Sequence, residues 1–229
     1  MFKSLMVSAA GAGLLTGVVA ALLQFWFLVP VLGSAELYEA GTLTHFGAGA
    51  AAGDGHAHAH AGVEGGFARY AGTLIATTAA YLGFALLLVA GFAVAEKAGL
   101  TRISARNGLL WGLAGFAATQ LFPALGLPPE LPGSAAAAVA ERQVWWIMTA
   151  ALSGAGLAVL AWVQGPARWA GVALIALPHI IAAPHPEAFA GVAPPEMAAL
   201  FAARALGVGA IAWALLGGAA GWFWQRQAA

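Results

Sequence analysis

The 229-residue sequence contains no cysteine, and only 8% of its residues carry a formal charge. The missing cysteines exclude disulfides, thiolate metal ligands, iron–sulfur clusters and cysteine nucleophiles. A soluble domain usually devotes about a quarter of its residues to charge, so this composition excludes a soluble enzyme. The sequence also lacks a basic patch for phosphates, which excludes a nucleic-acid partner, and it lacks a Walker A loop, which argues against ATP hydrolysis.

Apolar residues, in contrast, make up 62% of the chain and form long runs. A membrane-crossing helix requires about 20 mostly apolar residues, and six stretches reach or approach this length. They predict an all-α, polytopic membrane bundle that forms one domain over residues 1–229 and has the lipid bilayer as its surroundings. In chain order the predicted spans are 5–32, 71–95, 108–127, 144–163, a short fifth span at 169–183, and 198–224.

The first apolar run also resembles a secretory signal peptide, because Lys3 precedes it and small residues at 33–35 could form a cleavage site. Its apolar core is about twice the length that is usual for a signal peptide. We therefore interpret this run as a retained first span.

Charge is divided unequally between the two sides of the predicted membrane. With the N-terminus inside, the inner segments hold six basic residues and one acid, whereas the outer loops hold eight acids and two basic residues. Cytoplasmic loops are enriched in Lys and Arg, so both termini are predicted to be cytoplasmic. The net charge of zero thus results from basic residues on the inner side and acidic residues on the outer side. The acidic outer face indicates a protein that handles cations from outside.

The predicted outer loop 33–70 contains a tract of three alternating histidines, His56, His58 and His60. Alternate residues of an extended segment point the same way, so their imidazoles can converge on one divalent cation. The surrounding glycine and alanine cannot fix the geometry, which predicts modest affinity and poor selectivity. The alternative interpretation is a polar linker with incidental histidines.

The predicted fifth span ends in a proline-rich segment with two histidines and a carboxylate. Because Pro178 removes a backbone donor and Pro184 stops the helix, the chain is expected to unwind at or near the membrane surface. Short, proline-broken segments are typical of transporter binding sites. We therefore predict His179, His185 and Glu187 as metal ligands along a passage. The alternative is that His179 only hydrogen-bonds a neighbouring helix.

Arg204 is the only formal charge well inside a predicted span, about 10 Å beyond the start of the sixth. An unpaired arginine in hydrocarbon costs several kcal/mol or more, so this side chain must face the bundle and find a partner. The expected partners are Glu196, Glu187, Glu141 or a carbonyl of a broken helix. Its predicted role is structural or gating.

Other polar residues gather near the outer ends of the spans, whereas the inner halves are almost featureless. This asymmetry predicts a water-filled vestibule that opens outward above a hydrophobic inner gate. Structural or gating roles are predicted for Arg69, Arg142, Gln120, Pro178 and Pro184.

Glycines four residues apart allow helices to approach closely in lipid, and several such pairs occur. We interpret them as packing surfaces. The pairs are Gly13 with Gly17, Gly108 with Gly112, and Gly217 with Gly221.

Five local patterns, in this order and between apolar helices, resemble the CbtA family of predicted bacterial cobalt transporter subunits. The resemblance implies cobalt uptake across the inner membrane, a link to cobalamin, and a small one-helix, histidine-containing partner, CbtB. Imidazole and oxygen ligands also suit Ni²⁺ and Zn²⁺, so the cargo stays open among these ions. The patterns are Glu-Gly-Gly-Phe-Ala-Arg (64–69), Arg-Asn-Gly-Leu-Leu-Trp-Gly (106–112), Pro-Pro-Glu-Leu-Pro-Gly (128–133), Arg-Gln-Val-Trp-Trp (142–146) and Pro-His through Pro-His-Pro (178–186).

The predicted protein is a metal permease that catalyses no reaction and holds no permanently bound cofactor. Two other functions are alternatives to it. A membrane b-type cytochrome subunit would need at least two histidines within facing spans, and only His179 lies clearly inside one. A metal sensor or scaffold would bind metal without flux. Association into a homo-oligomer is also open.

Overall fold

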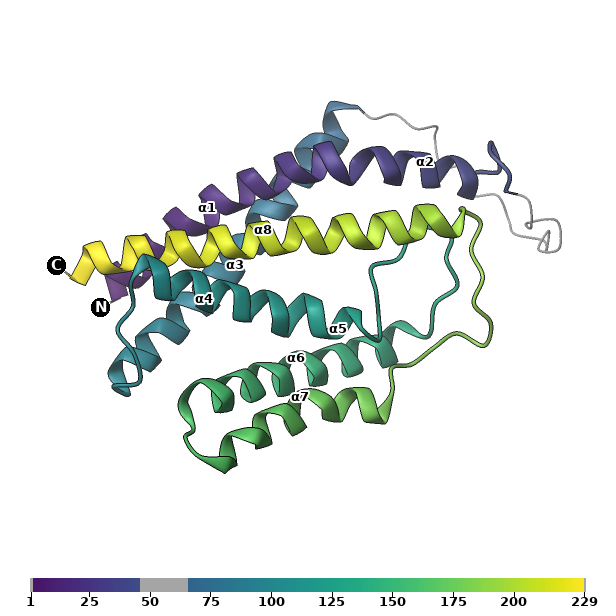
Figure 1. Cartoon of the computed structure of the whole chain (residues 1–229). Coiled ribbons are helices and arrows are strands. Elements are labelled where there is room, and N and C mark those ends of the chain that lie inside the picture. Colours follow the sequence, from purple (N-terminus) through teal and green to yellow (C-terminus); the bar gives the residue numbers. More distant parts are fainter. Residues whose placement is uncertain (1, 46–65, 229) are drawn as a thin grey trace.

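The computed structural model describes residues 2–45 and 66–228. These residues form helices joined by loops, which confirms the all-α prediction for this part of the chain (Figure 1). The elements are α1 (Phe2–Phe27), α2 (Val29–Glu39), α3 (Phe67–Lys97), α4 (Ala105–Phe116), the π-helix η2 (Ala117–Leu121), α5 (Phe122–Ala124), α6 (Val139–Trp162), the 3₁₀ helix η3 (Pro166–Trp169), α7 (Ala170–Ile181) and α8 (Pro195–Ala228).

Four of the described helices, α1, α3, α6 and α8, are long and apolar enough to cross a membrane. The helices at the predicted third and fifth spans are shorter, because α4 passes into η2 and α5, and α7 ends at Ile181. The longer helices begin before the predicted spans; α6, for example, begins at Val139 rather than 144. Hydropathy marks the apolar part of a helix, and polar turns continue it at either end.

The predicted first span is divided into two helices. α1 ends at Phe27, and α2 continues to Glu39 with Pro30 in its first turn, where a missing N–H is tolerated. Because α3 begins at Phe67, both ends of the segment 33–70 are helical. The histidines of the predicted tract, His56, His58 and His60, lie outside the described residues.

α1, α3, α4 and α8 pack into the main body of the molecule, and α6 and α7 form an antiparallel hairpin beside α4 and α5 (Figure 1). The core of the main body is aromatic and aliphatic, with Tyr81, Val89, Phe92, Trp213 and Leu216 buried in it. α7 contacts chiefly α6 and the short η3. The hairpin is therefore joined to the main body through α6.

The glycine pairs of α4 and α8 meet at the crossing of these two helices. A Cβ at Gly108 or Gly112 would collide with backbone atoms of Gly217, Gly221 or Trp213 on α8. The predicted packing surfaces are confirmed here, and also on α1, where Gly13 and Gly17 lie against the backbone of α3. Small residues bring these helices into backbone contact, which is a usual way for membrane helices to associate.

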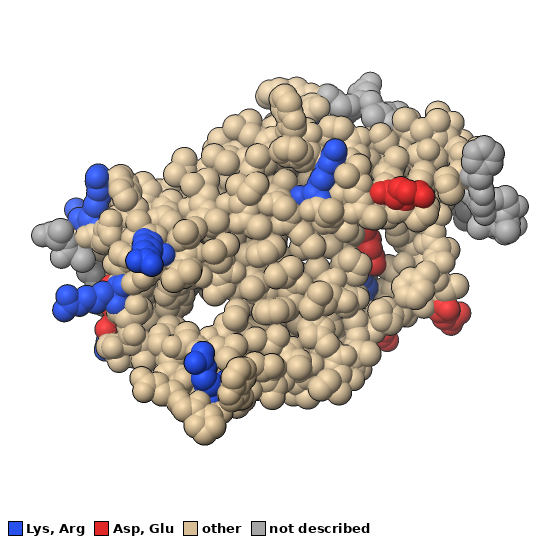
Figure 2. All heavy atoms as spheres, in the orientation of Figure 1, with Lys and Arg blue, Asp and Glu red and all other residues tan. Residues whose placement is uncertain are grey.

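The two ends of the bundle carry opposite charge. Both termini lie at one end, and Lys and Arg gather there, whereas Asp and Glu gather toward the opposite end (Figures 1 and 2). We call these the basic end and the acidic end. At the basic end the carboxylate of Glu96 accepts from the Ile103 N–H at 2.7 Å and from Trp224 Nε1 at 3.0 Å. This acid therefore ties α3, the following turn and α8 together.

Candidate functional site

The helix that begins at Ala105 widens into a π-bulge near the acidic end. Pro123 lacks an N–H and would clash with the carbonyl of an ideal α-helix four residues earlier. Over Ala117–Leu121 the chain adopts i→i−5 bonding instead, and the Phe122 N–H donates to the Ala117 carbonyl. The Thr119 hydroxyl donates to the Gly115 carbonyl at 2.8 Å. Such single-turn bulges are frequent at functional sites.

The bulge brings the Gln120 amide against α8. A Cβ at Gly209 would collide with Gln120 Oε1, so the glycine provides the room that this amide occupies. Gln120 is half-buried and lines a cavity. The structural or gating role predicted for Gln120 from the sequence stays a prediction.

Two cavities lie toward the acidic end. The first, the deep cavity, has a volume of about 900 Å³ and is lined by η2, the outer half of α6 and α8. The second, the outer cavity, has a volume of about 620 Å³ and lies between the loops 125–138 and 182–194 and the first turns of α8. The deep cavity includes Thr119, Gln120, Gln143, Trp146 and Leu206, and the outer cavity includes Ser134, Pro184, His185, Phe189 and Ala202.

The segment Leu127–Glu130 and the side chain of Arg142 line both cavities. Arg142 Nη2 lies 2.7 Å from Glu130 Oε2, and the two side chains are 29% and 30% exposed. This ion pair stands at the boundary between the cavities. Among the described residues, it supplies all the formal charge that lines them.

The backbone around Glu130 is held firmly. Leu131 is buried with Val31 and Ala35 of α2, and the loop pairs with the second outer loop through the Ala135 N–H and the Ala190 carbonyl at 2.8 Å. Three prolines around Glu130, at 128, 129 and 132, restrict the backbone further. The carboxylate therefore projects from a rigid support.

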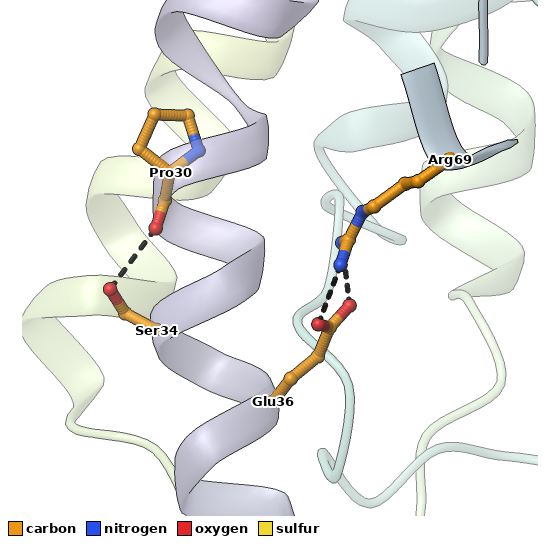
Figure 3. A network of polar contacts seen from close by, with 4 residues as sticks. All are labelled: Pro30, Ser34, Glu36 and Arg69. Atoms are coloured by element: carbon orange, nitrogen blue, oxygen red, sulfur yellow. Dashed lines mark hydrogen bonds and ion pairs between the residues drawn. The ribbon is translucent and has the colours of Figure 1, made fainter. Parts of the chain in front are cut away.

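A second ion pair joins α2 to α3, outside both cavities. Arg69 donates to both carboxylate oxygens of Glu36, at 2.8 and 2.6 Å, in the forked geometry that guanidinium favours (Figure 3). The Ser34 hydroxyl donates to the Pro30 carbonyl on the same helix, at 3.0 Å. The pair closes the two ends of the predicted outer loop onto each other.

His179 lies in α7 and packs against α6. Its ring is 5.7 Å from the Trp145 ring in edge contact, and Trp145 Nε1 donates to the Pro178 carbonyl at 3.2 Å. The Nε2 atom of His179 is buried and has no hydrogen-bond partner among the described residues. A buried polar atom without a partner is costly, so this nitrogen is a candidate contact for a ligand.

Beyond α7 the chain turns through Ala182, whose φ of 70° is strained for a residue other than glycine. The ring of His185 lies 5.6 Å from Phe189, and both His185 and Glu187 are exposed. No group of three or more His, Asp or Glu residues in the described part of the chain is close enough together to hold a metal ion. The ligands predicted along this segment are thus not gathered into a preformed site.

Arg204 donates from Nη1 to the carbonyl of Phe27 at 3.1 Å. The last carbonyls of a helix lack intrahelical donors, so α1 offers this acceptor where it breaks before Pro30. A carbonyl of a broken helix was one of the predicted partners. Arg204 is level with the end of α1, because the first turns of α8 run alongside α2 and pack on it through Met197 and Phe201.

Glu130 was not among the site residues predicted from the sequence, and neither was the contact of Trp145 with His179. A signal for Glu130 was present, since a carboxylate among three prolines in an outer loop is displayed on a stiff backbone. The signal for the bulge was Pro123 within an apolar run. Nothing in the sequence shows that Arg142 meets Glu130 across the loop.

Comparison with protein families gives one assignment. The sequence model of CbtA, described as a probable cobalt transporter subunit, matches residues 2–225. No curated protein and no solved structure matches the chain significantly.

Proposed function

The chain belongs to the CbtA family of probable cobalt transporter subunits, and we propose that it forms the path by which Co²⁺ crosses the bacterial inner membrane. The family match over residues 2–225 carries this proposal. The apolar helices and the two cavities toward the acidic end support it. As a subunit the chain works with another protein, which we propose is a one-helix, histidine-containing CbtB-like chain.

We propose that the chain crosses the membrane six times. The four long helices form four of these crossings. The continuous run of α4, η2 and α5 forms another, and the shorter pair of η3 and α7 forms the last. The basic end faces the cytoplasm and the acidic end faces outward, because cytoplasmic segments are enriched in Lys and Arg. An inside-negative potential then favours entry of a divalent cation by about 4 to 5 kcal/mol per 100 mV.

This orientation predicts which introduced thiols react from outside. The natural chain has no cysteine, so each variant carries a single thiol. Ala136→Cys, exposed in an outer loop, is expected to react with a membrane-impermeant maleimide added to intact cells. Ala98→Cys, exposed between α3 and α4, is expected to react only after the cells are opened. The reverse pattern would overturn the orientation.

The histidines have two proposed roles. His56, His58 and His60 collect cations outside, and His185, Glu187 and His179 pass them inward. His185 lines the outer cavity, and the buried Nε2 of His179 lies at the preceding end of α7. Co²⁺ is the proposed cargo. Ni²⁺ and Zn²⁺ accept the same ligands, so they are the necessary competitors in any assay.

Uptake of radioactive cobalt into vesicles tests this function. We expect time-dependent accumulation that depends on membrane potential and on this chain, with the CbtB-like partner present, and weaker inhibition by excess Ni²⁺ or Zn²⁺ than by excess unlabelled Co²⁺. Vesicles that bind cobalt but never accumulate it would indicate a sensor or scaffold instead. A strong Soret band from the purified protein would favour the haem alternative.

A further inference from the structure

We propose that the Glu130–Arg142 ion pair is a cation-operated latch between the two cavities, in which Glu130 binds the divalent cation and Arg142 is the counter-cation that it displaces. This inference rests on the proposed function and names a binding residue and a gate within it. Its starting point is the position of the pair, which lines the deep cavity and the outer cavity alike.

The charged residues in the cavity walls indicate Glu130 as the ligand. Among the described residues, Glu130 is the one carboxylate that lines either cavity. A divalent cation that leaves water needs anionic ligands to offset its desolvation. His185 and the Ser134 hydroxyl line the same outer cavity and supply donors that suit a borderline cation. Glu130 is therefore the one anionic ligand that the described walls offer to a cation in the outer cavity.

Arg142 occupies the place that such a cation would take. Its guanidinium lies 2.7 Å from the carboxylate and neutralises its charge. Two positive charges on a compact ion attract a carboxylate more strongly than one delocalised charge does. When the cation arrives, it is thus expected to replace Arg142 at the Glu130 carboxylate and to release the guanidinium.

The two partners differ in freedom to move. Glu130 lies in the loop held by Leu131 and the pairing of Ala135 with Ala190. Arg142 lies in the first turns of α6 on a long side chain, and the deep cavity beside it presents the amides of Gln120 and Gln143. The guanidinium is therefore the part that swings, and its departure opens the boundary between the cavities.

Cobalt binding to purified protein tests the ligand role, independently of transport. By equilibrium dialysis we expect Glu130→Gln to weaken Co²⁺ binding at least tenfold, and Arg142→Gln to strengthen it several-fold because the competitor is gone. Arg142→Lys, which keeps the positive charge on a shorter side chain, should fall between wild type and Arg142→Gln. These opposite signs distinguish a ligand from a structural pair, for which the two glutamine variants would lose stability alike and bind Co²⁺ as wild type does.

The chain offers a matched control. The Glu36–Arg69 pair has a similar distance and similar exposure, 31% and 27%, but lines neither cavity. Glu36→Gln should change Co²⁺ binding less than twofold. An equal loss in Glu36→Gln and Glu130→Gln would overturn the assignment of Glu130. Wild-type binding without uptake would overturn the proposed transport but leave the ligand assignment standing.

A single thiol in the deep cavity tests the gate. In Thr119→Cys, whose side chain lines the same cavity and is half-buried, we expect an impermeant maleimide added outside to react at least fivefold faster when Co²⁺ is present, because Arg142 has left the boundary. Adding Glu130→Gln should abolish this Co²⁺ dependence, and adding Glu36→Gln should not. A rate that is the same with and without Co²⁺ would overturn the latch.

Discussion

Gly217→Ala is expected to lower the thermal unfolding midpoint of the detergent-solubilised protein by about 6 to 12 °C, or to prevent its accumulation in the membrane. The added methyl group would collide with the Gly108 carbonyl and with the backbone of Gly112. Because these obstacles are backbone atoms of α4, only separation of the helices can relieve the clash. Overpacking typically costs 1–3 kcal/mol, and a backbone collision lies at the upper end, at about 3 kcal/mol.

The adjacent residue supplies the control for this prediction. A Cβ at Gly218 would meet nothing within 4 Å, although Gly218 lies in the same helix. Alanine is favoured over glycine in a helix by up to about 1 kcal/mol. Gly218→Ala is therefore expected to leave the midpoint unchanged or to raise it. Equal destabilisation by the two substitutions would contradict the described crossing of α4 and α8.

His179→Ala is expected to reduce cobalt uptake at least tenfold at every external cobalt concentration. The variant removes the imidazole whose Nε2 is buried without a partner, and a lost ligand in the path cannot be compensated by more cation outside. The measurement is the initial rate of radiocobalt uptake as a function of concentration. His185→Ala, which alters the wall of the outer cavity, is expected to act in the same direction.

The collector histidines are expected to give a different result. Replacing His56, His58 and His60 together should raise the concentration that gives half-maximal uptake but leave the maximal rate near that of wild type. Because His179 also packs on Trp145, the amount of His179→Ala in the membrane and its unfolding midpoint must be measured alongside. Normal uptake by properly folded His179→Ala and His185→Ala would refute their place in the path.

Much of the helical arrangement could be predicted from the sequence because apolar length and the positions of charged residues are local properties. The division of the first span at Leu28 was not predicted, since Pro30 is compatible both with a helix end and with the first turn of a new helix. Helix ends were misplaced for a related reason. α6 begins at Val139, and its first turn is exposed and includes polar residues. Hydropathy therefore places the start of the membrane span later than the start of the helix.

The candidate site was predicted less well than the helices. Sequence reasoning gave Arg204 three acids or a carbonyl of a broken helix as its expected partners, and the contact in the structure is with a carbonyl, that of Phe27. It expected His179, His185 and Glu187 to act together, yet the turn at Ala182 sets His185 and Glu187 on an exposed loop, whereas His179 packs on α6. The Glu130–Arg142 pair depends on how a loop folds back, which periodicity does not encode.

The π-bulge of Ala117–Leu121 has a consequence for how relatives of this chain evolve. A bulge is one residue more than a regular helix needs, so it shifts the angular phase of everything after it by about 100°. Deleting one residue between Gly115 and Pro123 would remove this phase shift and rotate the start of the Pro-Pro-Glu loop away from α6. A one-residue gap at this place in a homologue should therefore be accompanied by loss or relocation of the acid at position 130.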